Sequence, residues 1–252
     1  MNTLEVKNLC VSTDGTDIIN GLNLKICSGE THVIMGPNGS GKSTLCYALM
    51  GHPRYTIRQG DVVINGTSIK SMSPDQRAIL GLFLGFQHPI EVAGLALNNF
   101  LRTASNAIAK GRDQTAKPQG PLDFYRLLKQ VAKSLNYDSA MLARNLNEGF
   151  SGGEKKRTEV LQLAVLKPKF ALLDEIDSGL DIDALRVVAA GIKSAFKKHE
   201  MGLLIITHHP RILNHIKPNF VHVMAQGKII MSGGHQLAKK LEKEGYSKLL
   251  KN

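Results

Sequence analysis

The chain has 252 residues, of which 42% are hydrophobic and 21% charged, as in an ordinary globular protein. This length suits one large core with a small inserted subdomain. No apolar run approaches the roughly 18 residues of a membrane-spanning helix, and residues 1–7 lack the basic region and apolar core of a signal peptide. We therefore expect a cytoplasmic protein with no direct membrane insertion.

The formal net charge is +11. Such a charge permits an acidic partner, a nucleic acid or an anionic membrane surface. The basic residues are dispersed, however, and no basic run exceeds three residues, which favours an ordinary solvated surface. The three cysteines, Cys10, Cys27 and Cys46, form no CxxC pair and are typical of reduced, structural thiols.

Short apolar runs alternate with longer periodic segments in the first third of the chain, a pattern typical of α/β proteins. The predicted elements are strands over residues 4–11, 22–26 and 31–35, a helix over 43–50, a strand over 61–64, a helix capped by Ser73-Pro74, and a strand over 82–86 that ends at Gln87. Residues 88–149 are mostly helical in pattern and are interrupted by a polar loop over 111–121, which indicates an inserted helical subdomain.

The α/β alternation returns after residue 150. The predicted elements are a helix from Ser151 to Lys167 stopped by Pro168, a strand over 170–173, a helix whose core face contains Ile182, Leu185, Ala189, Ile192 and Phe196, a strand over 203–207, and a hairpin of residues 220–224 and 228–231 joined at Gln226-Gly227. We expect one domain, with the helical subdomain inserted at about residues 88–149.

A phosphate-binding loop follows the strand over residues 31–35. The pattern G-x-x-x-x-G-K-[ST] is matched by Gly36, Pro37, Asn38, Gly39, Ser40, Gly41, Lys42, Ser43 and Thr44. Its glycines let successive backbone N–H groups surround phosphate oxygens, and the following helix adds its positive N-terminal end. We expect Lys42 to neutralise the β- and γ-phosphates and Ser43 to ligate magnesium. The alternative is a glycine-rich turn without a ligand.

Two acids end the apolar strand over residues 170–173. Asp174 suits the magnesium shell, and Glu175 can position or deprotonate an attacking water. A strand-end turn with ordinary surface acids is the alternative, but the phosphate loop upstream argues against it.

The segment Phe150-Ser-Gly-Gly-Glu-Lys-Lys-Arg157 opens the next helix. Ser151 and Glu154 have the spacing of a capping box. Gly152 and Gly153 weaken a helix but allow another group to approach the backbone closely. The three cations that follow lie where the helix dipole disfavours them, and a bound γ-phosphate would offset that cost. The alternative is a helix cap with no further role.

Together these residues resemble the ABC ATPase superfamily over nearly the whole chain. Residues 36–44 resemble its Walker A loop, Gln87 its Q-loop, residues 150–154 its signature, residues 170–175 its Walker B strand, residues 178–181 its D-loop and His208 its switch histidine. The resemblance implies a RecA-like P-loop core, an N-terminal antiparallel β subdomain and the inserted helical subdomain. It also implies ATP and Mg²⁺ as cofactors.

The resemblance assigns roles to individual residues. It implies that Glu175 is the general base, that Gln87 and His208 contact the γ-phosphate, and that Lys42 assists catalysis. Magnesium would be held by Ser43, Gln87 and Asp174. Ser151, Gly152, Gly153 and Asp181 would complete the ATP site of a second subunit in a transient head-to-tail homodimer.

Within the superfamily the chain is most similar to the SufC family, the ATPases of SUF iron–sulfur cluster assembly. Residues 150–157, 173–185 and 207–213 carry this resemblance, because many transporter ATPases have Pro-Thr or Ala-Thr where this chain has Ile176-Asp177-Ser178, and glutamine where it has Glu154. The implied partners are SufB and SufD. No aromatic residue lies near Val11, where many ABC ATPases stack one on adenine, so the preference for ATP rests on the resemblance.

Two other functions stay open. The first is a motor docked on separate membrane subunits of a transporter. The second is a DNA- or ribosome-associated ABC protein, suggested by the charge, although such proteins usually carry a second cassette or long coiled-coil insertions that this chain lacks. We therefore expect no nucleic-acid partner.

Overall fold

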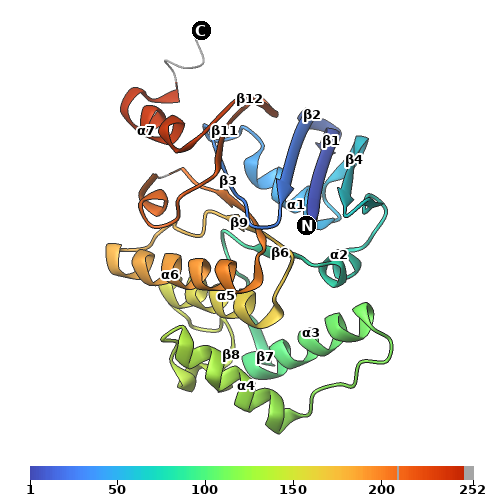
Figure 1. The fold of residues 1–252 in the computed structure, drawn as a ribbon, viewed down its shortest axis with the longest axis vertical. Coiled ribbons are helices and arrows are strands. Elements are labelled where there is room, and N and C mark those ends of the chain that lie inside the picture. The colour runs from blue at the N-terminus through green and yellow to red at the C-terminus, as the bar shows by residue number, and fades with distance from the viewer. Residues whose placement is uncertain (209, 247–252) are drawn as a thin grey trace.

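The computed structural model describes residues 1–208 and 210–246, and it confirms the predicted α/β class (Figure 1). Its larger sheet has six strands in the order β12-β11-β3-β10-β9-β6. These strands are β3 (Thr31–Met35), β6 (Leu82–Gly85), β9 (Phe170–Asp174), β10 (Gly202–Ile206), β11 (Phe220–Ala225) and β12 (Lys228–Gly233). Five of them are parallel, and β12 turns back antiparallel to β11.

A second sheet forms the N-terminal subdomain, at the upper right of Figure 1. It is antiparallel, with the order β2-β1-β4-β5. Its strands are β1 (Thr3–Thr13), β2 (Thr16–Cys27), β4 (Thr56–Ile64) and β5 (Thr67–Ser68). Strands β2 and β4 begin earlier than predicted because polar residues and a glycine interrupt the apolar pattern of their first halves.

The central strands are buried on both faces, as parallel strands between helices must be. Alternate residues of β9 point to opposite sides: Leu172 packs in the cluster that contains Leu45 and Leu49 of α1 (Lys42–Met50), whereas Leu173 packs in the cluster that contains Ile192 of α6 (Ile182–His199). Helix α5 (Gly152–Leu166) covers the same face as α6. This layering places the ends of β3, β6, β9 and β10 at one edge of the sheet, where the candidate site lies.

The inserted segment forms the lower part of Figure 1. It contains β7 (Val92–Ala96), α3 (Leu97–Arg112), α4 (Pro121–Ser134), the 3₁₀ helix η1 (Ser139–Ala143) and β8 (Asn145–Leu146). Helices α3, α4 and η1 and strand β8 share an apolar cluster with Leu161 and Val165 of α5 and with Phe150, which precedes that helix. The β7–β8 ladder was not predicted, because β7 contains a glycine and its partner strand is only two residues long.

The remaining helices are α2 (Pro74–Leu80), α7 (His235–Glu244) and the 3₁₀ helix η2 (Pro210–Asn214). Ser73 caps α2 with proline at the first helical position, as predicted. The predicted core face of α6 was wrong at Ile182, which is 66% exposed, because the first residue of the helix projects beyond the sheet. Arg77, on α2, is buried and donates to the Ala48 and Leu49 carbonyls at the end of α1.

Two buried histidines lie at the opposite end of the sheet from the phosphate loop. His32 Nδ1 of β3 lies 3.0 Å from His222 Nε2 of β11. His32 Nε2 also contacts Glu30 at 3.2 Å, and His222 Nδ1 contacts the Ser232 hydroxyl at 2.7 Å. All these contacts are satisfied when both rings are neutral, with each ring acting once as donor and once as acceptor. Burial, with a smaller contribution from His32, lowers the pKa of His222 to about 4.

This depressed pKa predicts an acid-sensitive fold. In the unfolded chain His222 binds a proton with a pKa near 6.5, whereas in the folded chain its pKa is about 4. The contribution of the neutral ring to the free energy of unfolding is therefore complete above pH 6.5 and declines below it. The loss by pH 4 should reach about 3 kcal/mol in the free energy of unfolding. We expect His222→Gln to flatten this decline in urea unfolding measured between pH 7 and 4.5. The exposed His52→Gln is the control, and an equal flattening there would contradict the assignment.

Candidate nucleotide site

The phosphate loop connects β3 to α1, in agreement with its sequence pattern. Two of its glycines are required by the geometry. A Cβ added to Gly36 would lie 2.1 Å from the Met224 carbonyl oxygen of β11, so the loop passes directly against that strand. Gly41, the residue that caps α1, has φ of 99°, which side chains rarely adopt. The loop therefore packs directly against β11 and requires glycine at both positions.

Lys42 is buried at the first position of α1. Its ammonium donates to the carbonyls of Gly36 and Pro37 at 3.0 and 2.8 Å, across the mouth of the loop. Burial lowers the pKa of Lys42, while the nearby Glu175 and Asp174 carboxylates act in the opposite direction. The Lys42 ammonium thus lies inside the loop, where the oxygen of a bound phosphate would take the place of the two carbonyl acceptors.

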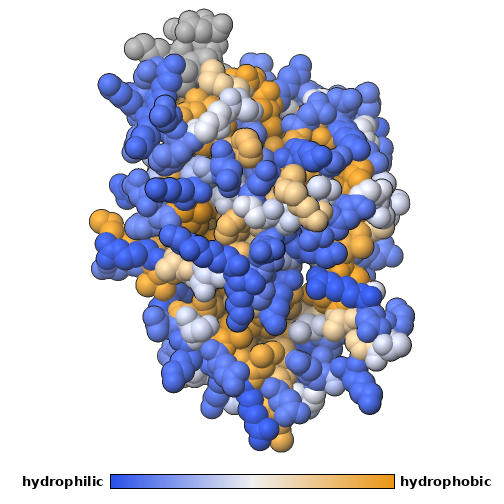
Figure 2. Space-filling model, in the orientation of Figure 1, coloured by the Kyte–Doolittle hydropathy of each residue, from blue (hydrophilic) through white to orange (hydrophobic). Residues whose placement is uncertain are grey.

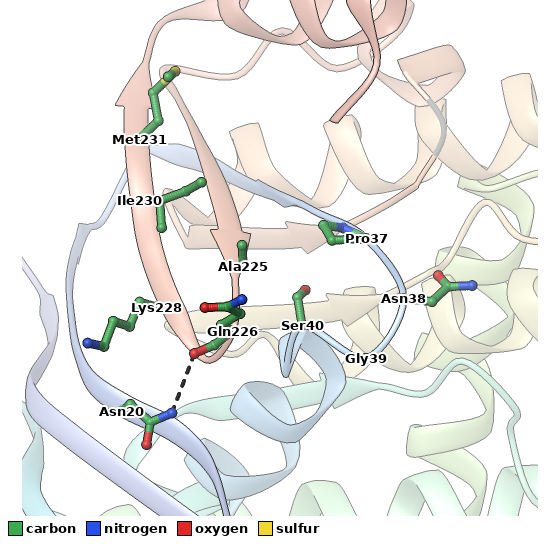
Figure 3. Close-up of a pocket in the computed structure, with 10 residues that line it drawn as sticks. All are labelled: Asn20, Pro37, Asn38, Gly39, Ser40, Ala225, Gln226, Lys228, Ile230 and Met231. Atoms are coloured by element: carbon green, nitrogen blue, oxygen red, sulfur yellow. Dashed lines mark hydrogen bonds between the residues drawn. The ribbon is translucent and has the colours of Figure 1, made fainter. Parts of the chain in front are cut away.

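The turn between β11 and β12 braces the loop from outside (Figure 3). Gly227 N donates to the Ser40 carbonyl at 3.0 Å, and Asn20 N donates to the Gly227 carbonyl at 3.0 Å. The Asn20 side chain also reaches the Gln226 carbonyl. A hollow of about 1100 Å³ lies between this hairpin and residues 37–40 of the phosphate loop. Asp174 and Glu175 do not line it.

Asp174 ends β9 beside the loop. Its Oδ1 accepts from the Ser43 hydroxyl at 3.2 Å, while its Oδ2 is buried with no hydrogen-bond partner among the described residues. Burial raises the pKa of Asp174 to about 6, against the opposing effect of the Ser43 hydrogen bond. An unsatisfied carboxylate oxygen beside a serine hydroxyl is a set of hard oxygen donors that fits Mg²⁺.

Glu175, the next residue, is the point at which three elements meet. Gln87 Nε2, after β6, donates to its Oε2 at 2.5 Å, and His208 Nε2, after β10, lies 2.6 Å from its Oε1. Glu175 has φ of 46°, and its N–H donates to the Ile206 carbonyl. The structure therefore brings together Gln87, Glu175 and His208, which the sequence places far apart.

The signature segment lies at the N-terminus of α5, and its predicted capping box is confirmed. Ser151 Oγ accepts from Glu154 N at 3.3 Å, and Glu154 Oε2 accepts from Ser151 N at 2.7 Å. Asp181 caps α6 by accepting from Ala184 N at 2.7 Å. Within residues 1–208 and 210–246, no hydrogen bond or ion pair joins Ser151, Gly152, Gly153 or Asp181 to the phosphate loop. One subunit thus leaves these groups outside its own site.

We predicted that a γ-phosphate would offset the unfavourable interaction of the three cations with the helix dipole. The structure does not support this need, because each cation has a partner within the chain. Lys155 forms an ion pair with Glu91 at 2.8 Å. Arg157 donates to the Asn136 carbonyl at 3.0 Å. Lys156 is buried and donates to the carbonyls of Phe86 and Gln87, each at 2.7 Å. The basic triplet therefore serves to attach α5 to its surroundings.

One residue near the site was missed by sequence reasoning. Glu159 of α5 is only 3% exposed, and its Oε1 accepts from Phe86 N at 2.6 Å. Burial raises the pKa of Glu159 to about 7, although Lys156, 4.0 Å away, acts in the opposite direction. The available signal was an acid three residues after a lysine, at the edge of the apolar run that continues with Val160 and Leu161.

Asp177, in the segment that departs from transporter ATPases, is also buried. Its Oδ2 accepts from the Thr207 hydroxyl at 2.7 Å, immediately before His208. The segment after the acidic pair is thereby tied to the end of β10. His209, the second of the two adjacent histidines, lies outside the described residues.

Residues 19–178 match the model of the ABC transporter family. The chain is 49% identical to a protein of Cyanophora paradoxa named as the probable ATP-dependent transporter ycf16, over 96% of this chain and 93% of that one. Among solved structures, the fold is similar to an ATP-binding cassette of an ABC transporter, with a TM-score of 0.78, 22% identity and coverage of 97% and 96%. It is also similar to a bacterial ABC transporter cassette solved as a dimer, with a TM-score of 0.76, 17% identity and coverage of 92% and 98%. In residues 1–208 and 210–246, no helix has the length and apolar character to span a membrane.

Proposed function

This chain belongs to the ABC transporter family, whose ATP-binding subunits hydrolyse ATP with Mg²⁺, and we propose that it powers a SufB–SufD scaffold in cytoplasmic iron–sulfur cluster assembly. The observation that carries the proposal is the segment from Ile176 to Ser178, which resembles SufC rather than transporter motors. Asp177 in this segment is fastened to Thr207 beside His208. Asp177, which distinguishes this segment, thus contacts the residue next to His208 at the candidate nucleotide site.

We propose that residues 36–44 surround the ATP phosphates. Lys42 would exchange the Gly36 and Pro37 carbonyls for β- and γ-phosphate oxygens. Ser43, Asp174 and Gln87 would hold Mg²⁺, which supplies positive charge to the transferring phosphoryl group. The orphaned Oδ2 of Asp174 supports this assignment.

We propose Glu175 as the general base for the attacking water. Both of its oxygens accept from neighbours, one from Gln87 and one from His208. Each oxygen keeps a second lone-pair site, so Glu175 can accept a proton from water while Gln87 and His208 hold its carboxylate in place. The arrangement therefore supports a base that two neighbouring side chains orient.

The signature residues support a shared site. Among the described residues, the start of α5 makes no hydrogen bond to the subunit's own phosphate loop, and a helix N-terminus is a suitable phosphate site. We propose that Ser151, Gly152, Gly153 and Asp181 complete the ATP site of a second copy in a transient head-to-tail dimer. The related cassette solved as a dimer supports this assembly.

A groove beside the site suits a protein partner. It has a volume of about 350 Å³ and lies between α2, α3, β6 and α5, with an apolar lining that includes Ile79, Phe83, Phe100, Ile108 and Leu166. Figure 2 shows that hydrophilic side chains cover most of the face in view, with apolar patches among them. Because β6 leads directly to Gln87, a scaffold protein in this groove would sense the nucleotide site.

The proposal is tested by the partners recovered with the affinity-tagged chain from gently lysed cells of its source. We expect a soluble complex that contains SufB- and SufD-like proteins and binds iron. Recovery with integral membrane proteins, and without a soluble iron-binding partner, would overturn the SUF assignment. That outcome would favour a transport motor, the function that the name of the Cyanophora paradoxa relative suggests.

A further inference from the structure

The segment from Phe86 to Glu91, here called the Q segment, is attached to the signature region by side chains from residues 147–159. At its start, Glu159 Oε1 accepts from Phe86 N at 2.6 Å. Lys156 Nζ donates to the Phe86 and Gln87 carbonyls. Three hydrogen bonds from one helix thus hold the backbone on both sides of the Phe86–Gln87 peptide.

The other end of the Q segment is attached as well. Asn147 Nδ2 donates to the Ile90 carbonyl at 2.8 Å. Glu91 accepts from Lys155 Nζ at 2.8 Å and from Gly149 N at 3.4 Å. The two Glu91 contacts are exposed and contribute less than buried ones, whereas Asn147 is itself buried. Of the buried attachments, those made by Glu159 and Lys156 lie at Phe86 and Gln87 themselves, whereas the Asn147 bond lies three residues beyond Gln87.

We propose that Glu159 is a positioning residue for ATP hydrolysis, acting through the Phe86 N–H to place Gln87 against Glu175. Gln87 is the next residue after Phe86, and its amide reaches Glu175 from there. A shift of the Phe86 backbone therefore moves the Gln87 amide directly. The inference rests on the ATPase activity of the family and is independent of the SufB–SufD assignment.

The surroundings of Glu159 show that its place is closely defined. A Cβ added to Gly85 would lie 2.9 Å from the Leu173 side chain and 3.7 Å from Glu159 Oε2, so the end of β6 is pressed against β9 and α5. Glu159 Oε2 has no hydrogen-bond partner among the described residues. The one short hydrogen bond of this buried carboxyl group goes to the backbone before Gln87, and its other oxygen lies 4.0 Å from Lys156 Nζ.

The test compares two substitutions in the purified full chain, with ATP as substrate. Glu159→Gln keeps an oxygen that accepts from Phe86 N, whereas Glu159→Met has a similar size and cannot accept. We expect Glu159→Met to lower kcat about tenfold or more with little change in KM for ATP, since small displacements of positioning groups cost rate rather than binding. Glu159→Gln should retain most of the wild-type kcat.

Thr158→Val is the matched control on the same helix. Thr158 is fully buried and bonds the Tyr137 hydroxyl at 2.8 Å without touching the Q segment. Its loss should lower the melting temperature and leave kcat unchanged. If Glu159→Met does not fold, Lys156→Met removes the two bonds to the Phe86 and Gln87 carbonyls and serves in its place.

A double-variant cycle decides whether Glu159 acts through Gln87. In a Gln87→Ala background, Glu159→Met should cause no further loss of kcat, because the group it positions is gone. An equal loss in both backgrounds would overturn the proposal. So would a wild-type kcat in Glu159→Met, or an equal loss in Glu159→Gln and Glu159→Met. Since the assay uses the chain alone, none of these outcomes depends on which partner it has.

Discussion

Glu175→Gln is expected to lower ATP turnover by about 10²–10⁴-fold while ATP binding is retained, because an amide cannot take a proton from the attacking water. The substitution also changes the contacts at this position. The carboxylate accepts from both Gln87 and His208. A glutamine offers one acceptor oxygen, so one of these two contacts is lost. The measurement is single-turnover hydrolysis, together with ATP affinity by equilibrium titration.

The matched control for this substitution is Glu242→Gln, which makes the same chemical change at an exposed position of α7. It should hydrolyse ATP at the wild-type rate. Undiminished hydrolysis by Glu175→Gln would remove Glu175 as the base. Loss of ATP binding in this variant would instead indicate that Glu175 supports the shape of the phosphate site.

Local sequence patterns predicted those elements whose signal lies within a few residues. The bounds of β3 were predicted to the residue, and the hairpin turn at Gln226-Gly227 and the Ser151 cap are confirmed. In each case the sequence signal lies in residues close in the chain, although the ladder partners of β3 are the distant strands β10 and β11. The phosphate loop belongs to the same class, because its own glycines identify it even though β11 and Gly227 help to hold it.

The contacts that could not be predicted join distant residues. The Lys156 contacts with the Q segment span 70 and 69 residues, and the Glu159 contact spans 73. Sequence reasoning offset the basic triplet, Lys156 included, with a γ-phosphate, because the helix dipole disfavours cations at an N-terminus. The partner is instead a pair of backbone carbonyls, which carry no residue-specific signal. Ile182 was misplaced for a related reason, since helical spacing identifies a face but not where the core ends.

Ser151→Arg is expected to block ATP-driven dimerisation and to lower hydrolysis about a hundredfold or more, while the subunit still binds ATP. The long cation would occupy the space in front of the α5 N-terminus, where the γ-phosphate of a second copy must approach. The change also removes the capping box, which should cost about 1 kcal/mol of stability. Sedimentation in the Glu175→Gln background with ATP measures the dimer without turnover.

Ser73→Arg separates the loss of a cap from the loss of the shared site. Ser73 caps α2 with a capping box of the same kind, completed by Gln76, and it is exposed as Ser151 is. Both substitutions should lower the free energy of unfolding to a similar extent, but only Ser151→Arg should abolish the dimer. If Ser73→Arg abolishes it equally, the effect belongs to stability. If the wild-type chain hydrolyses ATP at its full rate at dilutions where it is monomeric, the site needs no second subunit, and the N-terminus of α5 has only the capping role that its hydrogen bonds already show.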